Sequence, residues 1–202
     1  MANPAMRSER DVHLREYENV TQTYVLESFG SGMADELRFV ANDVSGGMVP
    51  VSGHHKGENR MSSLEEQVHE KAHLAVDQLQ ERAGGRLDYS EASLEAIEHI
   101  LDEAAQYAAE MEQSNVDALV QLIGSYILAV AHKAHGGAFC WHEQQDQPAL
   151  VVGEPQRHVA IMTFSKVKSR LGGDKADNIP FFYQGFSARA KSATPGTHAL
   201  YV

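Results

Sequence analysis

The chain has 202 residues, of which 43% are hydrophobic and 22% charged, as in a soluble globular protein with one sizeable core. Its formal net charge of −11 disfavours nucleic acid and anionic membranes as partners, and no apolar run reaches the roughly 18 residues of a membrane-spanning helix. The polar start of the chain predicts no secretory signal, and the single cysteine, Cys140, indicates a reducing compartment, so we expect a cytoplasmic protein.

Residues 1–60 are weakly patterned. Short strands are predicted within Val20–Phe29 and Leu37–Val40, and glycine-rich, polar stretches separate and follow them. We therefore predict a loosely structured extension that ends in a linker. Met61 follows this linker and offers an alternative start for the well-patterned part of the chain.

The first of three predicted helices has clear signals at both ends. A capping box, Ser62 with Glu65 or Ser63 with Glu66, begins it, and Gly84-Gly85 ends it. Apolar residues recur between these signals at helical spacing, which predicts one buried side and one solvated side.

Two more helices follow. Ser90 is the expected N-cap of the second, with Tyr89 and Leu94 placed to form a hydrophobic staple. Ser114 is the expected start of the third, which is apolar on nearly all sides and therefore predicted to be central. Gly124 inside that helix weakens it by about 1 kcal/mol, so we expect a neighbouring element to approach closely there.

The pattern then changes to short segments rich in β-branched and aromatic residues. Ala138–His142, Ala149–Val152 and Arg157–Met162 predict a three-stranded antiparallel meander. Thr163–Leu171 returns to helical spacing. The aromatic cluster within Ile179–Phe186 is expected to pack on the core.

The predicted elements make up an α+β fold, with a three-helix N-terminal half packed on the small meander and then a short helix. We place a single domain at residues 61–186 and a flexible tail at residues 187–202.

Several of these segments resemble uncharacterised bacterial domains of unknown function. The similarity rests on the run Leu87–Leu94, on the long helix that ends before Trp141, and on Phe164–Val167 with Arg170-Leu171. It covers residues 85–186. The resemblance implies a shared fold and brings no assigned activity.

The His-Glu-x-x-His motif from His69 to His73 is the one stretch of the sequence that suggests a particular catalytic chemistry. On a helix the two histidines could hold zinc, with Glu70 as general base. However, the histidines lie roughly 100–140° from the apolar stripe on a helical wheel, so we expect them on the solvated side. We therefore favour no catalytic residue, no metal and no cofactor. Three downstream residues stay open as the third ligand in the alternative: Glu91, Glu95 and Glu98.

Other candidate groups are weaker. His132 and His135 lie near the end of the third helix, where cations complement the helix dipole. Cys140 and His142 share one face of a strand, but at about 6.5–7 Å between their backbones they are too far apart for a nucleophile pair, so Cys140 is expected to be a buried small side chain. A basic patch lacks the interleaved aromatic residues of a nucleic-acid surface: Lys166, Lys168, Arg170 and Lys175.

The charge is distributed unevenly. Residues 61–117 hold fourteen acidic and three basic residues, a net −11. We therefore expect a non-enzymatic interaction module that binds a basic protein through an acidic helical face, for example an immunity or antitoxin-like protein. The alternative is a small zinc-dependent hydrolase that uses His69, Glu70 and His73. A small-ligand module built on Trp141 and Phe181–Tyr183 is a third hypothesis.

Overall fold

The computed structural model describes residues 23–26, 39–42 and 63–202. In its first part, β1 (Thr23–Leu26) pairs antiparallel with β2 (Phe39–Asn42), and each overlaps one of the two predicted strand segments. The remainder of the expected extension and linker, including Met61, lies outside the described residues.

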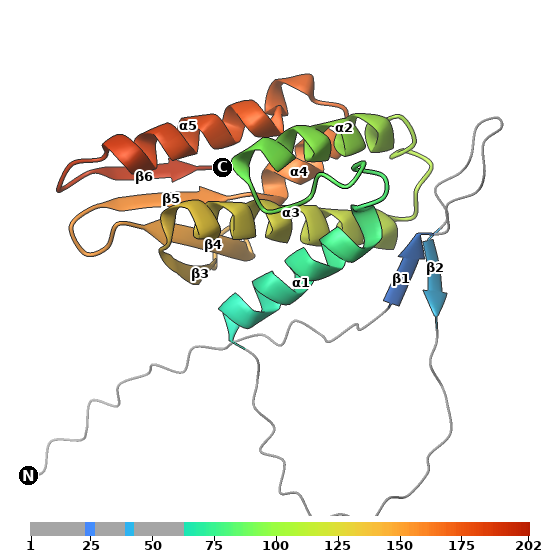
Figure 1. The fold of residues 1–202 in the computed structure, drawn as a ribbon, viewed down its shortest axis with the longest axis horizontal. Coiled ribbons are helices and arrows are strands. Elements are labelled where there is room, and N and C mark those ends of the chain that lie inside the picture. The colour runs from blue at the N-terminus through green and yellow to red at the C-terminus, as the bar shows by residue number, and fades with distance from the viewer. Residues whose placement is uncertain (1–22, 27–38, 43–62) are drawn as a thin grey trace, which may run out of the picture.

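The described part from Ser63 onward is a mixture of helices and one sheet (Figure 1), which confirms the predicted α+β class. Its α-helices are α1 (Leu64–Leu79), α2 (Leu94–Ala105), α3 (Gln113–His135), α4 (Phe164–Leu171) and α5 (Ile179–Ser192). Two short 3-10 turns, η1 (Glu91–Ser93) and η2 (Lys175–Asp177), precede α2 and α5.

Local sequence explains where these helices begin. Ser63 Oγ accepts a hydrogen bond from the Glu66 backbone N–H (3.2 Å), and Glu66 Oε2 accepts one from the Ser63 N–H (2.7 Å), so the second of the two predicted capping boxes forms. Ser90 is an N-cap as predicted, although it begins η1 and not α2 directly. The predicted start at Ser114 is wrong, because α3 begins at Gln113 and its N-cap, Glu112, makes no side-chain cap.

The sheet contains β3 (Ala138–His142), β4 (Gln147–Val152), β5 (His158–Met162) and β6 (His198–Tyr201), in that spatial order. The first three form the predicted antiparallel meander, but β6 adds to β5 in parallel, so the prediction of a three-stranded sheet is wrong. The chain crosses from β5 to β6 through α4 and α5. Residues 187–202, expected as a flexible tail, complete α5 and supply β6.

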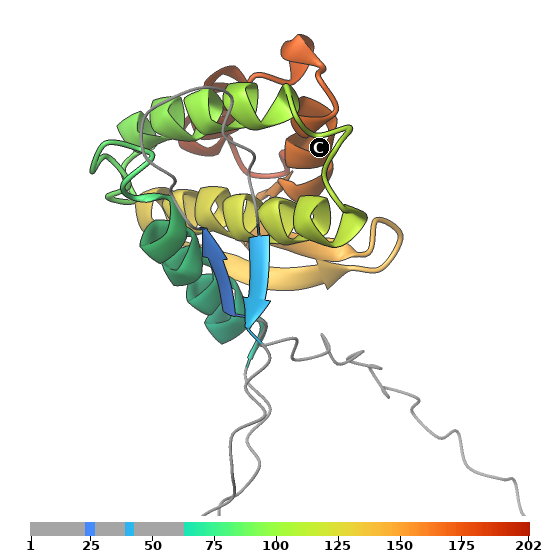
Figure 2. The ribbon, with the colours of Figure 1, turned by 90° about the vertical axis from the view of Figure 1, so that its right-hand side faces the viewer.

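Helix α3 lies at the centre of this arrangement, between α2 on one side and α1 on the other (Figures 1 and 2). Every residue from Ala118 to Ala131 is buried except Gln121, which is half-buried, as predicted for a central helix. By length and composition α3 would also pass for a membrane span, but 72% of that stretch is buried inside the protein, and core helices of soluble proteins pass the same test.

The predicted close approach at Gly124 is confirmed, and the neighbour is the start of α4. A Cβ added at Gly124 would lie 2.4 Å from Cδ1 of Phe164. Beside it, Thr163 Oγ1 donates a hydrogen bond to the Gly124 carbonyl oxygen (2.8 Å). The absence of a side chain on α3 is therefore what allows α4 to dock.

We expect Gly124→Ala to lower the free energy of unfolding by about 1–3 kcal/mol, because the new methyl group overpacks the contact with Phe164. Gly185→Ala in α5 is the matched control. Its Cβ would meet Tyr201 Cε1 at an ordinary 3.4 Å, so this variant should gain about 0.5–1 kcal/mol from lower chain entropy in the unfolded state. Urea denaturation measures both, and equal shifts would contradict the tight contact.

Candidate functional site

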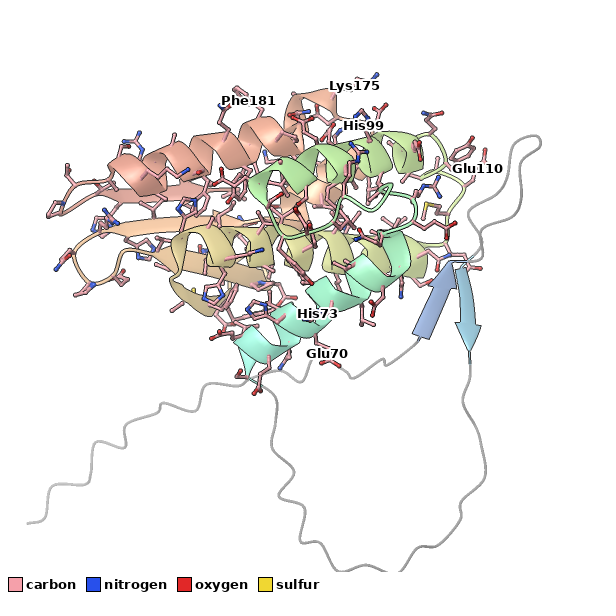
Figure 3. All side chains as sticks on the ribbon, viewed as in Figure 1. Glu70, His73, His99, Glu110, Lys175 and Phe181 are labelled. Carbon is pink, nitrogen blue, oxygen red and sulfur yellow. The ribbon has the colours of Figure 1, made fainter. Side chains whose placement is uncertain are left out.

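The two histidines of the His-Glu-x-x-His motif have different surroundings on α1. His69 is half-buried, and its Nε2 lies 3.2 Å from Nδ1 of His132, in the last turn of α3. His73 is exposed, and its Nδ1 lies 3.3 Å from the hydroxyl of Tyr89. Glu70, the base in the alternative hypothesis, is exposed and projects outward from α1 (Figure 3).

The prediction that both imidazoles are solvated is therefore wrong for His69. The reason is the end of α3 and the strand after it, which cover that edge of α1. The ring of Phe139, on β3, packs edge-on against His69 with centroids 5.9 Å apart, and against His132 with centroids 4.9 Å apart. A helical wheel of α1 alone gives no sign of this cover, because it comes from residues more than 60 positions further along the chain.

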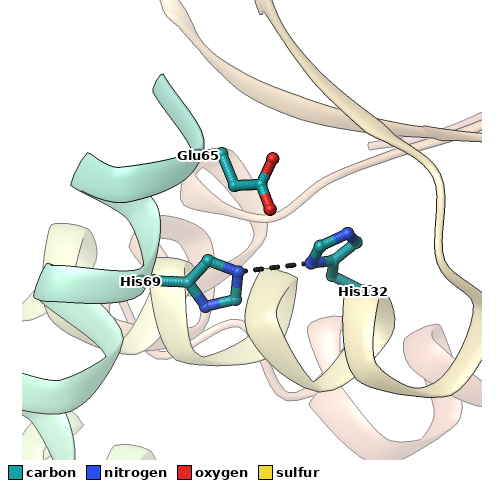
Figure 4. Close-up of side chains that lie close together, drawn as sticks. All are labelled: Glu65, His69 and His132. Atoms are coloured by element: carbon teal, nitrogen blue, oxygen red, sulfur yellow. Dashed lines mark hydrogen bonds between the residues drawn. The ribbon is translucent and has the colours of Figure 1, made fainter. Parts of the chain in front are cut away.

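Glu65 lies one turn before His69 and completes a cluster of donor atoms (Figure 4). One carboxylate oxygen of Glu65, one ring nitrogen of His69 and one of His132 all lie within 4.8 Å of one another. Burial and then the nearby His132 lower the pKa of His69 below its ordinary value, which favours the neutral ring with one nitrogen lone pair. Among the described residues, Glu65, His69 and His132 form the one group of three or more such side chains close enough together to hold a metal ion.

The three carboxylates expected as a third ligand lie elsewhere. They belong to α2 and the turn before it, on the opposite side of α3 from α1 (Figure 1). Glu98 accepts hydrogen bonds from Arg170 Nε (2.7 Å) and the Ile179 N–H (2.9 Å). Glu91 accepts one from Ser187 Oγ (3.0 Å), and Glu95 is exposed. None of them is placed to complete a site with His69.

His135 turns away from His132 and joins a second polar cluster. Its Nε2 lies 3.2 Å from Ser187 Oγ and 3.7 Å from Glu91 Oε1. These contacts do not form a catalytic triad. Glu91 lies near Ser187 and near the same nitrogen of His135, Nε2, that faces the serine. In a triad the acid instead contacts the other ring nitrogen. Burial lowers the pKa of His135, which keeps it neutral. The cluster therefore serves to tie the end of α3 to α5.

Cys140 is exposed, so the prediction of a buried thiol is wrong. Cys140 belongs to the edge strand β3, and the alternating residues Phe139 and Trp141 occupy the side that faces the helices. Although the residue as a whole is exposed, partial desolvation of its thiol raises the pKa, which opposes activation as a nucleophile. His142 Nδ1 accepts a hydrogen bond from the Gln145 N–H (3.3 Å) within the turn after β3.

Trp141 forms part of the wall of an open hollow of about 580 Å³ between α3, α4 and the turn from β3 to β4. Buried Gln147 supports this wall, since its Oε1 accepts the Phe164 N–H (2.9 Å). The aromatic cluster of α5 does not extend this surface: Tyr183 and Phe186 are buried, whereas Phe181 is 74% exposed. The third hypothesis placed Trp141 and Phe181–Tyr183 on one ligand-binding surface. Of these described residues, only Trp141 lines the hollow, so the structure gives no such joint surface.

The acidic residues of α2 are partly balanced inside the fold. Arg170 of α4 is buried, with its Nε 2.7 Å from Glu98 Oε1 and an Nη 2.6 Å from Asp102 Oδ1. Lys166 likewise lies 2.7 Å from Asp177 Oδ1. Two of the four residues of the predicted basic patch, Lys166 and Arg170, are therefore paired within the molecule, whereas Lys168 and Lys175 are exposed.

A second acidic set follows the outer side of α1. Glu66, Glu70 and Asp77 recur at spacings of four and seven residues, and Glu81 continues the line in the turn after the helix. All four side chains are exposed, and we call them the α1 acidic stripe. Leu74 lies beside them and is 40% exposed. In the described part of the chain, none of the salt bridges involves the last three of these carboxylates, and the charge of Lys71 interacts with Glu70.

Comparisons with protein-family models, curated proteins and solved structures found no match to this chain. The resemblance to bacterial domains therefore stays a prediction. Sequence reasoning missed Glu65 and His132 as partners of His69. The spacing of Glu65 one turn before His69 was a usable signal, whereas only the crossing of α1 and α3 reveals His132.

We expect Arg170→Met to lower the free energy of unfolding by about 3–5 kcal/mol, because it leaves the largely buried Glu98 carboxylate without its cation. Arg82→Met is the matched control. Arg82 pairs with Glu103 at the surface, where such pairs contribute at most about 1 kcal/mol. Chemical denaturation of the two variants compares them, and similar small losses would refute a structural role for the buried network.

Proposed function

We propose that this chain is a non-enzymatic, cytoplasmic interaction module that binds a basic protein through the α1 acidic stripe. The observation that carries the proposal is the row of exposed carboxylates along one side of a helix whose other side is fixed in the core. An immunity or antitoxin-like role, in which the partner is a basic toxin of bacterial origin, is the specific form of this proposal.

The stripe has the physical properties that such docking needs. Three of its four carboxylates are on α1 and Glu81 is in the turn that follows, so their backbone is already ordered before a partner binds. Clustered charge of one sign accelerates encounter with a basic surface. Leu74 adds an apolar contact beside the charges. The acidic residues of α2 are a weaker choice, since Arg170 already binds Glu98 and Asp102.

The alternative, a zinc hydrolase in which His69 and His73 bind the metal and Glu70 is the base, has less support. Glu70 projects outward, and His73 contacts Tyr89. A catalytic zinc site needs its ligands to converge in a partly dry cleft. The exposed positions of Glu70 and His73 do not offer one.

The proposal is tested by neutralising the stripe and measuring binding to whatever partner the wild-type chain enriches from a lysate of the source organism. We expect the triple variant Glu70→Gln, Asp77→Asn, Glu81→Gln to bind that partner at least about tenfold more weakly, because three charges that attract it are lost. Wild-type binding should also weaken as salt rises from about 0.05 to 0.5 M. Biolayer interferometry with the purified partner gives both numbers.

The matched control is Glu95→Gln, Glu110→Gln, Glu112→Gln, which removes the same charge from exposed positions on and after α2. It should bind as the wild type does, and both triple variants should keep their stability to within about 0.5 kcal/mol, as exposed substitutions do. Equal losses in the two variants, or binding that ignores salt, would rule out the stripe as the docking surface.

A further inference from the structure

We propose that Glu65, His69 and His132 form a binding site for one divalent first-row transition ion of the zinc type. The ligands are Nε2 of His69, Nδ1 of His132 and a carboxylate oxygen of Glu65. The site uses only one histidine of the His-Glu-x-x-His motif and takes its second from α3. His73 and Glu70 play no part in it.

The spacing of the two ring nitrogens supports the site. Zinc–nitrogen bonds of about 2.0–2.1 Å place two neighbouring ligands of one ion about 2.8–3.0 Å apart in octahedral geometry and about 3.3–3.4 Å apart in tetrahedral geometry. The nitrogens of His69 and His132 are 3.2 Å apart. Glu65 supplies the third ligand, because among the described residues it is the acidic side chain with an oxygen within 4.8 Å of both nitrogens.

The fold holds these donors on rigid elements. Glu65 and His69 are one turn apart on α1, directly after the capping box at Ser63. His132 lies within α3, the most deeply buried helix. Phe139 packs against both imidazoles and fixes the planes of the rings from one side. Glu65 is exposed on the other side, which leaves an entry path for the ion.

The donor set also selects the class of ion. Two imidazoles and one carboxylate suit zinc and its neighbours, whereas Mg²⁺ and Ca²⁺ prefer oxygen donors alone. With three protein ligands, the remaining coordination positions go to water. Binding through Nε2 of His69 and Nδ1 of His132 needs each ring to carry its proton on the opposite nitrogen, which a neutral imidazole can do without losing a proton. The ion replaces the ring-to-ring hydrogen bond.

The test is metal titration of the full chain, purified without a histidine tag and stripped with a chelator. Calorimetry with Zn²⁺ should show one ion bound at this site, and Co²⁺ should give the visible absorption of a site with nitrogen ligands. His69→Ala and His132→Ala should each weaken Zn²⁺ binding at least about 100-fold, more than loss of an outer-shell partner would. Zn²⁺ should also raise the melting temperature of the wild type but not of these variants.

His73→Ala is the matched control, since it removes an exposed histidine one turn away on the same helix and should leave Zn²⁺ affinity within about threefold of the wild type. A loss of binding in His73→Ala that His132→Ala does not share would overturn the proposal in favour of the sequence motif. Unchanged binding in every variant would show an adventitious ion on the other histidines, for example the stacked pair His158 and His198.

A variant at His132 could also fail to fold, so a second measurement uses the wild type alone. Zn²⁺ should shift the NMR signals of His69 Nε2 and His132 Nδ1 together, and leave those of His73 in place. Shifts at His73 without His132 would overturn the site. Because the α1 acidic stripe includes none of the three ligands, metal binding and partner binding succeed or fail separately.

Discussion

Almost all of the residues Ala118–Ala131 of helix α3 are buried from water. Each fully buried Leu, Ile or Val side chain there contributes at most about 1.5–3 kcal/mol to the free energy of folding. One neighbour cannot cover a helix on all sides. The chain therefore places α1, α2, α4 and the sheet around it, and two local features bring them close. Gly124 admits the ring of Phe164, and the hydroxyl of the buried Tyr126 binds Ser93 Oγ (2.7 Å) in the turn before α2.

The same burial decides where polar chemistry can occur. The stretch from Ala118 to Ala131 contains no charged residue and no histidine, and the histidines of α3 lie at its end. His132 and His135 leave the last turn toward different neighbours, His69 on α1 and Ser187 on α5. The candidate metal site is thus a meeting point of three elements that the core has already brought together.

Features encoded within a few residues could be predicted from the sequence. The capping box at Ser63, the central position of α3 and the close approach at Gly124 all follow from local pattern. Features that depend on distant pairing could not. β6 is recognisable only beside β5, because its four residues carry a weak strand signal of their own.

The candidate site also has one part that local sequence predicts and one part that depends on distant pairing. Glu65 and His69 share one helix and one side, which their spacing of four residues discloses. His132 lies 63 positions from His69, and only the crossing of two helices joins them. Likewise, the acidic segment that the sequence suggests as one surface separates into a stripe on α1 and a set on α2. Arg170 partly offsets the second set, and it lies 72 positions from Glu98 and 68 from Asp102 in the sequence.

The only tryptophan of the chain offers an optical probe of this region. Trp141 follows Phe139 by two residues on the same side of β3, so the indole is about 6.5–7 Å along the strand from the ring that packs on His69 and His132. It also borders the open hollow beside Phe164. Its fluorescence therefore reports on the edge of the sheet. A paramagnetic ion at the site or a small molecule in the hollow would quench it. Binding on the far side of α2 would leave the fluorescence unchanged.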